Sequence, residues 1–171
     1  MENNSRLSEN LVNPIELNLK AVSDGEIIKI EEVLDPIFSE KIMGDGYGLI
    51  PTGTKLYSPI SEKIEEIART KHAIYLSADN QIKLLIHIGI NTIELEGKGF
   101  ETNLENGMSV EEGDLLISFD AEYIRTEGYN PVISIVLLDQ KGAEIDSMTH
   151  PRKKAIANES LALEAKIYKE N

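Results

Sequence analysis

The sequence predicts an all-β fold: an antiparallel β-sandwich or barrel-sandwich hybrid of short strands with minor helical turns. Short apolar runs recur from residue 21 to residue 138, separated by Gly, Pro, Asn and Asp residues that form turns. The body of the chain lacks the helices of a dozen or more residues that a parallel sheet needs between its strands. Aromatic residues make up 5% of the chain, so a core of Ile, Leu and Val, which suit pleated sheets, is expected.

The strands are expected where the apolar runs lie. These runs are EIIKIEEV (26–33), YGLIP (47–51), AIYLSA (73–78), IKLLIHIGI (82–90), DLLISFD (114–120) and PVISIVLL (131–138). Turns are expected between them, for example at Asp24-Gly25, Asp79-Asn80 and Asn106-Gly107.

Composition divides the chain into three segments. Residues 1–19 are rich in Asn, Ser and Glu and predict a flexible tail, with a short amphipathic helix around Leu11 to Leu19. Residues 20–140 have the length of one ordinary domain. Residues 141–171 form an extension in which good helix formers, with apolar Leu161, Ala165 and Tyr168, indicate a short helix or a frayed tail.

Charge and cysteine content exclude several classes of function. The 30 acidic and 17 basic residues give a net charge of −13, which disfavours nucleic acid and anionic membranes and favours partners with a basic face. Cysteine is absent, so there is no disulfide scaffold, thiol nucleophile or thiolate metal site. No signal peptide is recognisable and no apolar run approaches the roughly 18 residues of a membrane span, so a cytoplasmic protein without stable membrane insertion is expected.

Three histidines are the candidates for chemistry. His150 lies beside a proline and three cations and is expected to be an exposed tail residue. His72 and His87 lie in strand-like runs with the Asp79-Asn80 turn between them, consistent with a hairpin that brings the imidazoles together. Of two neutral imidazoles in contact, one can act as nucleophile and the other can donate a hydrogen bond to an incoming anion. Gly89 offers a backbone N–H that could also point at the anion. Spacing alone leaves several chemistries open.

Four stretches together carry a family resemblance. They are FSEKIMGDGYGLIPTGTKLYSPI (38–60), TKHAI (70–74), LLIHIGINTIELEGKGF (84–100) and GMSVEEGDLLISFD (107–120). In this order they closely resemble the glucose-type enzyme IIA (EIIA) of the bacterial phosphoenolpyruvate-dependent sugar phosphotransferase system. The resemblance covers about residues 21–138.

The resemblance implies a phosphotransferase with a phosphohistidine intermediate and no cofactor or resident metal. It assigns His87 as the phosphorylated nucleophile, His72 as the residue that stabilises the phosphoryl group, Thr70 as the residue that orients His72, and Gly89 as a backbone donor. The donor would be the histidine phosphocarrier protein and the acceptor the cysteine of a sugar-permease IIB domain, with regulated transporters or kinases as further partners.

The resemblance also implies a docking surface for these partners. An apolar ring is expected around the site, with Phe38 exposed, although periodicity alone favours a core position for Ile42. Asn91 replaces the usual Asp of the family, which weakens pairing with an arginine of the donor. The residues assigned to partner binding are Asp35, Phe38, Met43, Leu85, Asn91 and Ile93.

Three other readings compete with the phosphocarrier. The main one is a regulatory protein-binding module of the same system with little transfer flux. A zinc hydrolase is disfavoured because residue 89 is Gly, so no HxH motif exists, and two histidines leave a zinc site short of ligands. A purely structural role for both histidines leaves the ordered match unexplained.

Overall fold

The computed structural model describes residues 14–77, 82–138, 143–149 and 153–169. Strands dominate, as predicted, and every strand ladder is antiparallel. The strands are β1 (Ile15–Lys20), β2 (Gly25–Lys29), β3 (Gly44–Pro51), β4 (Lys55–Tyr57), β5 (Glu62–Ile67), β6 (Ala73–Ser77), β7 (Lys83–Ile88), β8 (Phe100–Glu101), β9 (Ser109–Val110), β10 (Leu115–Phe119), β11 (Ile133–Leu138), β12 (Ala143–Thr149), β13 (Lys153–Ala155) and β14 (Leu161–Lys169). Short helices are η1 (Ile30–Glu32), α2 (Pro36–Ser39), η2 (Thr92–Leu95) and α3 (Ala121–Thr126).

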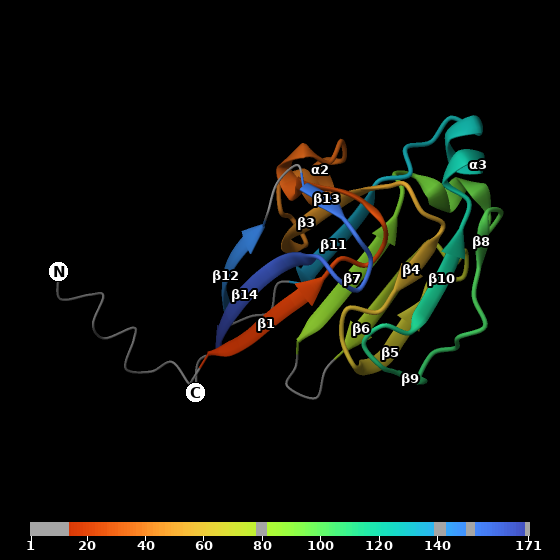
Figure 1. Cartoon of the computed structure of the whole chain (residues 1–171). Helices are drawn as coiled ribbons and strands as arrows, with labels where there is room; N and C mark the ends of the chain where they lie inside the picture. The colour runs from red at the N-terminus through yellow and green to blue at the C-terminus, as the bar shows by residue number, and fades with distance from the viewer. Residues whose placement is uncertain (1–13, 78–81, 139–142, 150–152, 170–171) are drawn as a thin grey trace, which may run out of the picture.

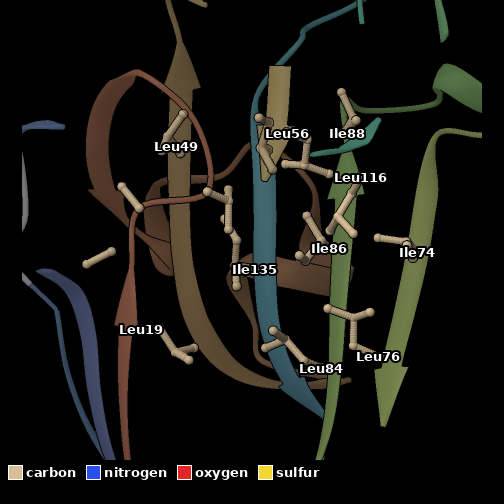
Figure 2. Packing of buried hydrophobic residues seen from close by; sticks show 14 of the residues in the cluster. Leu19, Leu49, Leu56, Ile74, Leu76, Leu84, Ile86, Ile88, Leu116 and Ile135 are labelled. Carbon is tan, nitrogen blue, oxygen red and sulfur yellow. The ribbon is translucent and has the colours of Figure 1, made fainter. Parts of the chain in front are cut away.

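The strands form one large sheet and two small ones (Figure 1). The large sheet has the order β13-β2-β3-β11-β7-β6-β5-β9, and the small sheets have the orders β1-β14-β12 and β4-β10-β8. The main core contains residues from all three sheets, for example Leu19 of β1, Leu56 of β4 and Ile86 of β7, which are labelled in Figure 2. The β-sandwich expectation is therefore confirmed.

The prediction of a C-terminal helix is wrong, because residues 161–169 form the central strand of the β1-β14-β12 sheet. Leu163, Ala165 and Ile167 are buried in the main core at a spacing of two residues, as in a strand with one inward face. Leu, Ala, Glu and Lys favour a helix locally, but pairing with β1 and β12 on both sides outweighs this preference.

The N-terminal tail is shorter than predicted, because residues 15–20 pair with β14 as strand β1 rather than forming a helix or a loose chain. Leu19 is buried in the main core, so the described parts of both ends belong to the same folded unit as residues 20–140. Residues 1–13 lie outside the described part of the chain. No helix among the described residues is long and apolar enough to cross a bilayer.

Strand β7 is covered on both faces, which explains its continuous apolar sequence. Leu84, Ile86 and Ile88 point into the main core, whereas Leu85 belongs to a second apolar cluster and alternates with His87 on the other face. A cover segment, residues 30–43 with η1 and α2, contributes Ile30, Val33 and Phe38 to this second cluster. The fold thereby places His87 at the edge of a small apolar layer.

Candidate active site

The predicted hairpin brings the two histidines together. Strands β6 and β7 pair in antiparallel register with Ala73 opposite His87, while the predicted turn at Asp79-Asn80 falls outside the described residues. The imidazole centroids of His72 and His87 are 4.9 Å apart and their planes are nearly perpendicular, at 82°. An anion bound to one ring would therefore lie within reach of the other.

Thr70 lies within hydrogen-bond distance of the His72 ring, the contact that its predicted role requires. The Thr70 Oγ1 and His72 Nδ1 atoms are 2.6 Å apart, and both residues belong to a tight turn between β5 and β6. The turn is closed by hydrogen bonds from Lys71 N–H to the Ala68 carbonyl (2.8 Å) and from Ala68 N–H to the Ala73 carbonyl (2.9 Å). When the Thr70 hydroxyl donates to Nδ1, the ring proton of neutral His72 resides on Nε2, which can donate to an anion.

Thr70→Val is expected to slow phosphoryl transfer about 10-fold, because the isosteric side chain removes one hydrogen bond and frees the tautomer of His72. The measurement is the rate of transfer to the chain in rapid-quench experiments. Thr70→Ser keeps the hydroxyl and should retain most of the rate. Equal rates for the valine and wild-type chains would contradict an orienting role.

Phe38 packs against the His87 ring instead of lying on the surface, so the prediction of an exposed Phe38 is wrong. Its side chain is 3% exposed, and its ring centroid lies 5.2 Å from that of His87. The cause is α2, whose N-terminus Asp35 caps by accepting a hydrogen bond from the Ile37 N–H. This short helix turns Phe38 inward onto the second apolar cluster.

Burial makes His87 a weak base. Burial and, to a smaller extent, the neighbouring His72 lower the pKa of His87 to about 4, against smaller opposing effects of the Gly89 backbone and Asp35. Burial also lowers the pKa of His72. Both rings are therefore neutral near pH 7, and a neutral ring keeps the lone pair that a nucleophile needs.

The low pKa of His87 predicts a pH-dependent stability. Between pH 6.5 and about 4 the unfolded chain protonates this histidine while the folded chain does not, so stability falls as the pH falls through this window. At about 1.4 kcal/mol per pH unit, the full loss from His87 is on the order of 3 kcal/mol. Urea unfolding from pH 7 to pH 4 should show a steeper loss for wild type than for His87→Gln, whereas parallel curves would contradict the buried, neutral ring.

Gly89 has a different role from the predicted one. Its N–H already donates to the Val132 carbonyl at 2.7 Å, so it is not a free donor to a phosphoryl group. The residue has φ +82°, and a Cβ atom there would lie 2.2 Å from Thr92 Cγ2 and 3.1 Å from the Asn130 carbonyl oxygen. Glycine is required because the chain turns sharply after His87 against η2.

Within the described ranges, no group of three or more His, Asp or Glu side chains is arranged to hold a metal ion.

Known proteins identify the family. The family described as "phosphoenolpyruvate-dependent sugar phosphotransferase system, EIIA 1" matches residues 17–143, a range that contains both histidines and the whole cover segment. The chain belongs to this family. An EIIA component takes a phosphoryl group from the histidine phosphocarrier protein and passes it to a IIB domain, so the chain is a phosphotransferase component of that system.

Individual relatives agree with this assignment. A "PTS system glucose-specific EIIA component" of Staphylococcus epidermidis is 41% identical over 132 residues, which cover 76% of this chain and 80% of the relative. The component of the same name from Staphylococcus aureus (strain COL) is 42% identical over 113 residues, 66% of this chain and 68% of the relative. The solved glucose permease IIA from Mycoplasma capricolum aligns with a TM-score of 0.78 and 27% identity over 87% of this chain and 96% of its own.

The surface around the EIIA histidines differs in part from the predicted docking surface. Leu85 is 1% exposed and lies under the site, so a direct contact of its side chain with a partner is excluded in this conformation. Met43 is half-buried against the second apolar cluster. Ile93 is 56% exposed, as a docking residue requires, and Ile42 is 63% exposed, which contradicts its assignment to the core.

Two exposed apolar residues of the cover segment were missed by the sequence reasoning. Leu34 is 80% exposed and Ile37 is 47% exposed, on either side of Asp35. The sequence feature that could have indicated their exposure is Asp35-Pro36, which is typical of a helix start. Asp caps the N-terminus of a helix and Pro suits its first turn. A helix beginning there turns Phe38 inward and leaves its neighbours outside.

Asn91 occupies a position with a backbone requirement of its own. It is exposed and adopts the left-handed conformation (φ +59°) at the start of η2, where its carbonyl accepts from the Glu94 N–H. Asn tolerates this conformation better than most residues. The backbone conformation is therefore a local reason for Asn at this position.

Proposed function

We propose that His87 carries the phosphoryl group, accepting it from the histidine phosphocarrier protein and passing it to the cysteine of a IIB domain during sugar uptake. The observation that supports this most directly is the pair of neutral imidazoles 4.9 Å apart, one of them oriented by Thr70. Since the relatives are named glucose-specific, we infer a IIB domain of a glucose-type permease as the acceptor. Transfer would take place in the cytoplasm, where the phosphoenolpyruvate-dependent system operates.

The ring nitrogen that attacks phosphorus would be Nε2. The Nδ1 atom of His87 is buried, so the accessible side of the half-buried ring would be at Nε2. Attack in line by Nε2 requires the ring proton to reside on Nδ1. The Nε2 lone pair then forms the bond to phosphorus, and the electron pair of the broken N–P bond stays on the donor's histidine ring.

The other groups of the site would support this step electrostatically. Phosphoryl transfer proceeds through a loose, metaphosphate-like transition state, so positioning and charge stabilisation account for most of the catalysis. His72, with its proton on Nε2, would donate a hydrogen bond to a phosphoryl oxygen. Phe38 would exclude water from one side of the His87 ring, which strengthens these interactions.

The docking partners would meet a surface that is apolar and acidic on the side of the cover segment. Leu34, Ile37 and Ile42 are exposed there, and exposed apolar patches of this kind mark protein interaction sites. Asp35 lies between two of them, so a partner with apolar residues and a cation fits this side.

The function is tested by incubating the chain with phosphoenolpyruvate, enzyme I and the histidine phosphocarrier protein, followed by intact-mass analysis. One acid-labile phosphoryl group, which is lost when a IIB domain is added, is expected. If the chain stays unmodified but binds the carrier or a transporter, the regulatory binding module becomes the better description. That alternative is compatible with the same exposed apolar surface.

A further inference from the structure

Two cations flank Thr70 at the edge of the active site. Arg69 and Lys71 belong to the tight turn between β5 and β6, and Thr70 between them contacts the His72 ring. Since the His72 and His87 rings are 4.9 Å apart, the turn borders the place where a phosphoryl group on His87 would lie. The long side chains of Arg and Lys can span such a distance.

Neither charge is neutralised within the described part of the chain. The ion pairs there involve Lys20, Lys41, Lys83 and Lys166, and none of them includes Arg69 or Lys71. Arg69 is exposed and Lys71 half-exposed. The segment that approaches this turn carries Glu94, Glu96 and Lys98, a net charge of −1. It meets the turn at Gly97, whose Cβ position would lie 3.8 Å from the Thr70 carbonyl oxygen.

Lys71 adopts the left-handed backbone conformation, which Gly and Asn adopt more readily than Lys. Its φ is +59°. A strained residue beside a functional site is a reason to look for a role of its side chain. Asn would suit this backbone conformation but would lack the ammonium group, so the positive charge is the candidate role of Lys71.

On the opposite side of the site, the cation of the cover segment (residues 30–43, all described) is already paired. Lys41 is the cation of the cover segment, and it pairs with Glu31 at 3.0 Å and with Asp45 at 3.5 Å. Asp35 adds a negative charge close enough to act on His87. In a chain of net charge −13, an incoming phosphoryl dianion is therefore attracted from the side of the β5–β6 turn.

We propose that Arg69 and Lys71 form a cationic rim that steers the phosphoryl group of the donor toward His87 and holds it during transfer. The inference rests on the proposed function. The rim takes no part in bond making: the phosphoryl group leaves the donor's ring nitrogen with the N–P electron pair remaining there, and His87 Nε2 supplies the new electron pair. Arg69 and Lys71 lower the electrostatic cost of bringing a dianion to an acidic protein.

The test compares two double variants that remove equal charge. Arg69→Gln with Lys71→Asn removes the rim, and Asn suits the left-handed conformation at residue 71. Lys153→Gln with Lys154→Gln removes two exposed charges from β13, five strands away from β6 in the order of the large sheet. The measurement is the second-order rate constant for transfer from the phosphorylated histidine carrier at low and high salt.

Loss of the rim is expected to lower this rate constant about 10-fold at low ionic strength, with the difference shrinking toward twofold near 0.5 M salt. The β13 variant should change less than twofold, and Arg69→Lys with Lys71→Arg should restore most of the rate. Equal losses in both charge-removing variants, a loss independent of salt, or no loss would each overturn the proposal. An unphosphorylated wild-type chain would instead refute the proposed function itself.

Discussion

Replacing His87 by glutamine is expected to abolish phosphorylation of the chain by the complete donor system. Glutamine approximates the size and polarity of the ring but has no nitrogen lone pair that can attack phosphorus, so the rate should fall at least on the order of 10⁴-fold. The measurement is intact-mass analysis after incubation with phosphoenolpyruvate, enzyme I and the histidine phosphocarrier protein. The fold should persist, since His87 lies at the edge of the second apolar cluster and not among its members.

The matched control is His150→Gln, which changes the one histidine that lies outside the described residues. It should accept one phosphoryl group, as wild type does. A phosphorylated His87→Gln chain would show that another side chain carries the group, and His72, whose ring is 4.9 Å away, would then be the candidate.

Replacing Gly89 by alanine is expected to cause the largest loss of stability of any single methyl addition near the site. The new Cβ would lie 2.2 Å from Thr92 Cγ2, and the φ of +82° is unfavourable for any residue with a side chain. Strain of the left-handed conformation and overpacking together should cost about 2–4 kcal/mol. Relief of this contact would shift the backbone at residue 89 and displace His87, two residues away, so phosphoryl transfer should also slow.

The variant Gly107→Ala separates backbone strain from overpacking as causes of the stability loss in Gly89→Ala. Gly107 has nearly the same φ, +89°, but nothing lies within 4 Å of its Cβ position. Its replacement should cost only about 1–2 kcal/mol, the backbone contribution alone. Urea unfolding of both variants measures the difference, and equal losses would show that the contact with Thr92 relaxes without cost.

The two histidines of the site could be identified from the sequence because the features that bring them together lie within one short stretch of the chain. His72 and His87 stand in apolar runs joined by a turn, and antiparallel pairing of adjacent strands then places them near each other whatever the rest of the chain does. The ordered motifs around them were enough to indicate the family and with it Thr70, whose contact with His72 spans two residues. The structure agrees with these expectations.

The exposure of the apolar residues around the site could not be predicted from their positions in the sequence. Phe38 and Ile42 are four residues apart, yet Phe38 is buried and Ile42 is 63% exposed. The short helix α2 turns Phe38 inward and ends at Ser39, so Ile42 lies in the connection that precedes β3. Leu85 and His87 share a face of β7, but the cover segment buries the first and reaches only the edge of the second. Such differences depend on which distant segment covers which strand.

The sequence by itself determined that the chain is rich in strands, acidic and free of cysteine, and that two histidines are brought together by one hairpin. These properties depend on composition and on contacts between residues close in the chain. Only the tertiary structure decided that residues 161–169 form a strand, that the Gly89 N–H is already occupied, and that Phe38 is buried against the His87 ring. Each of these depends on a pairing or packing partner far away in the sequence, whose free energy outweighs local preference.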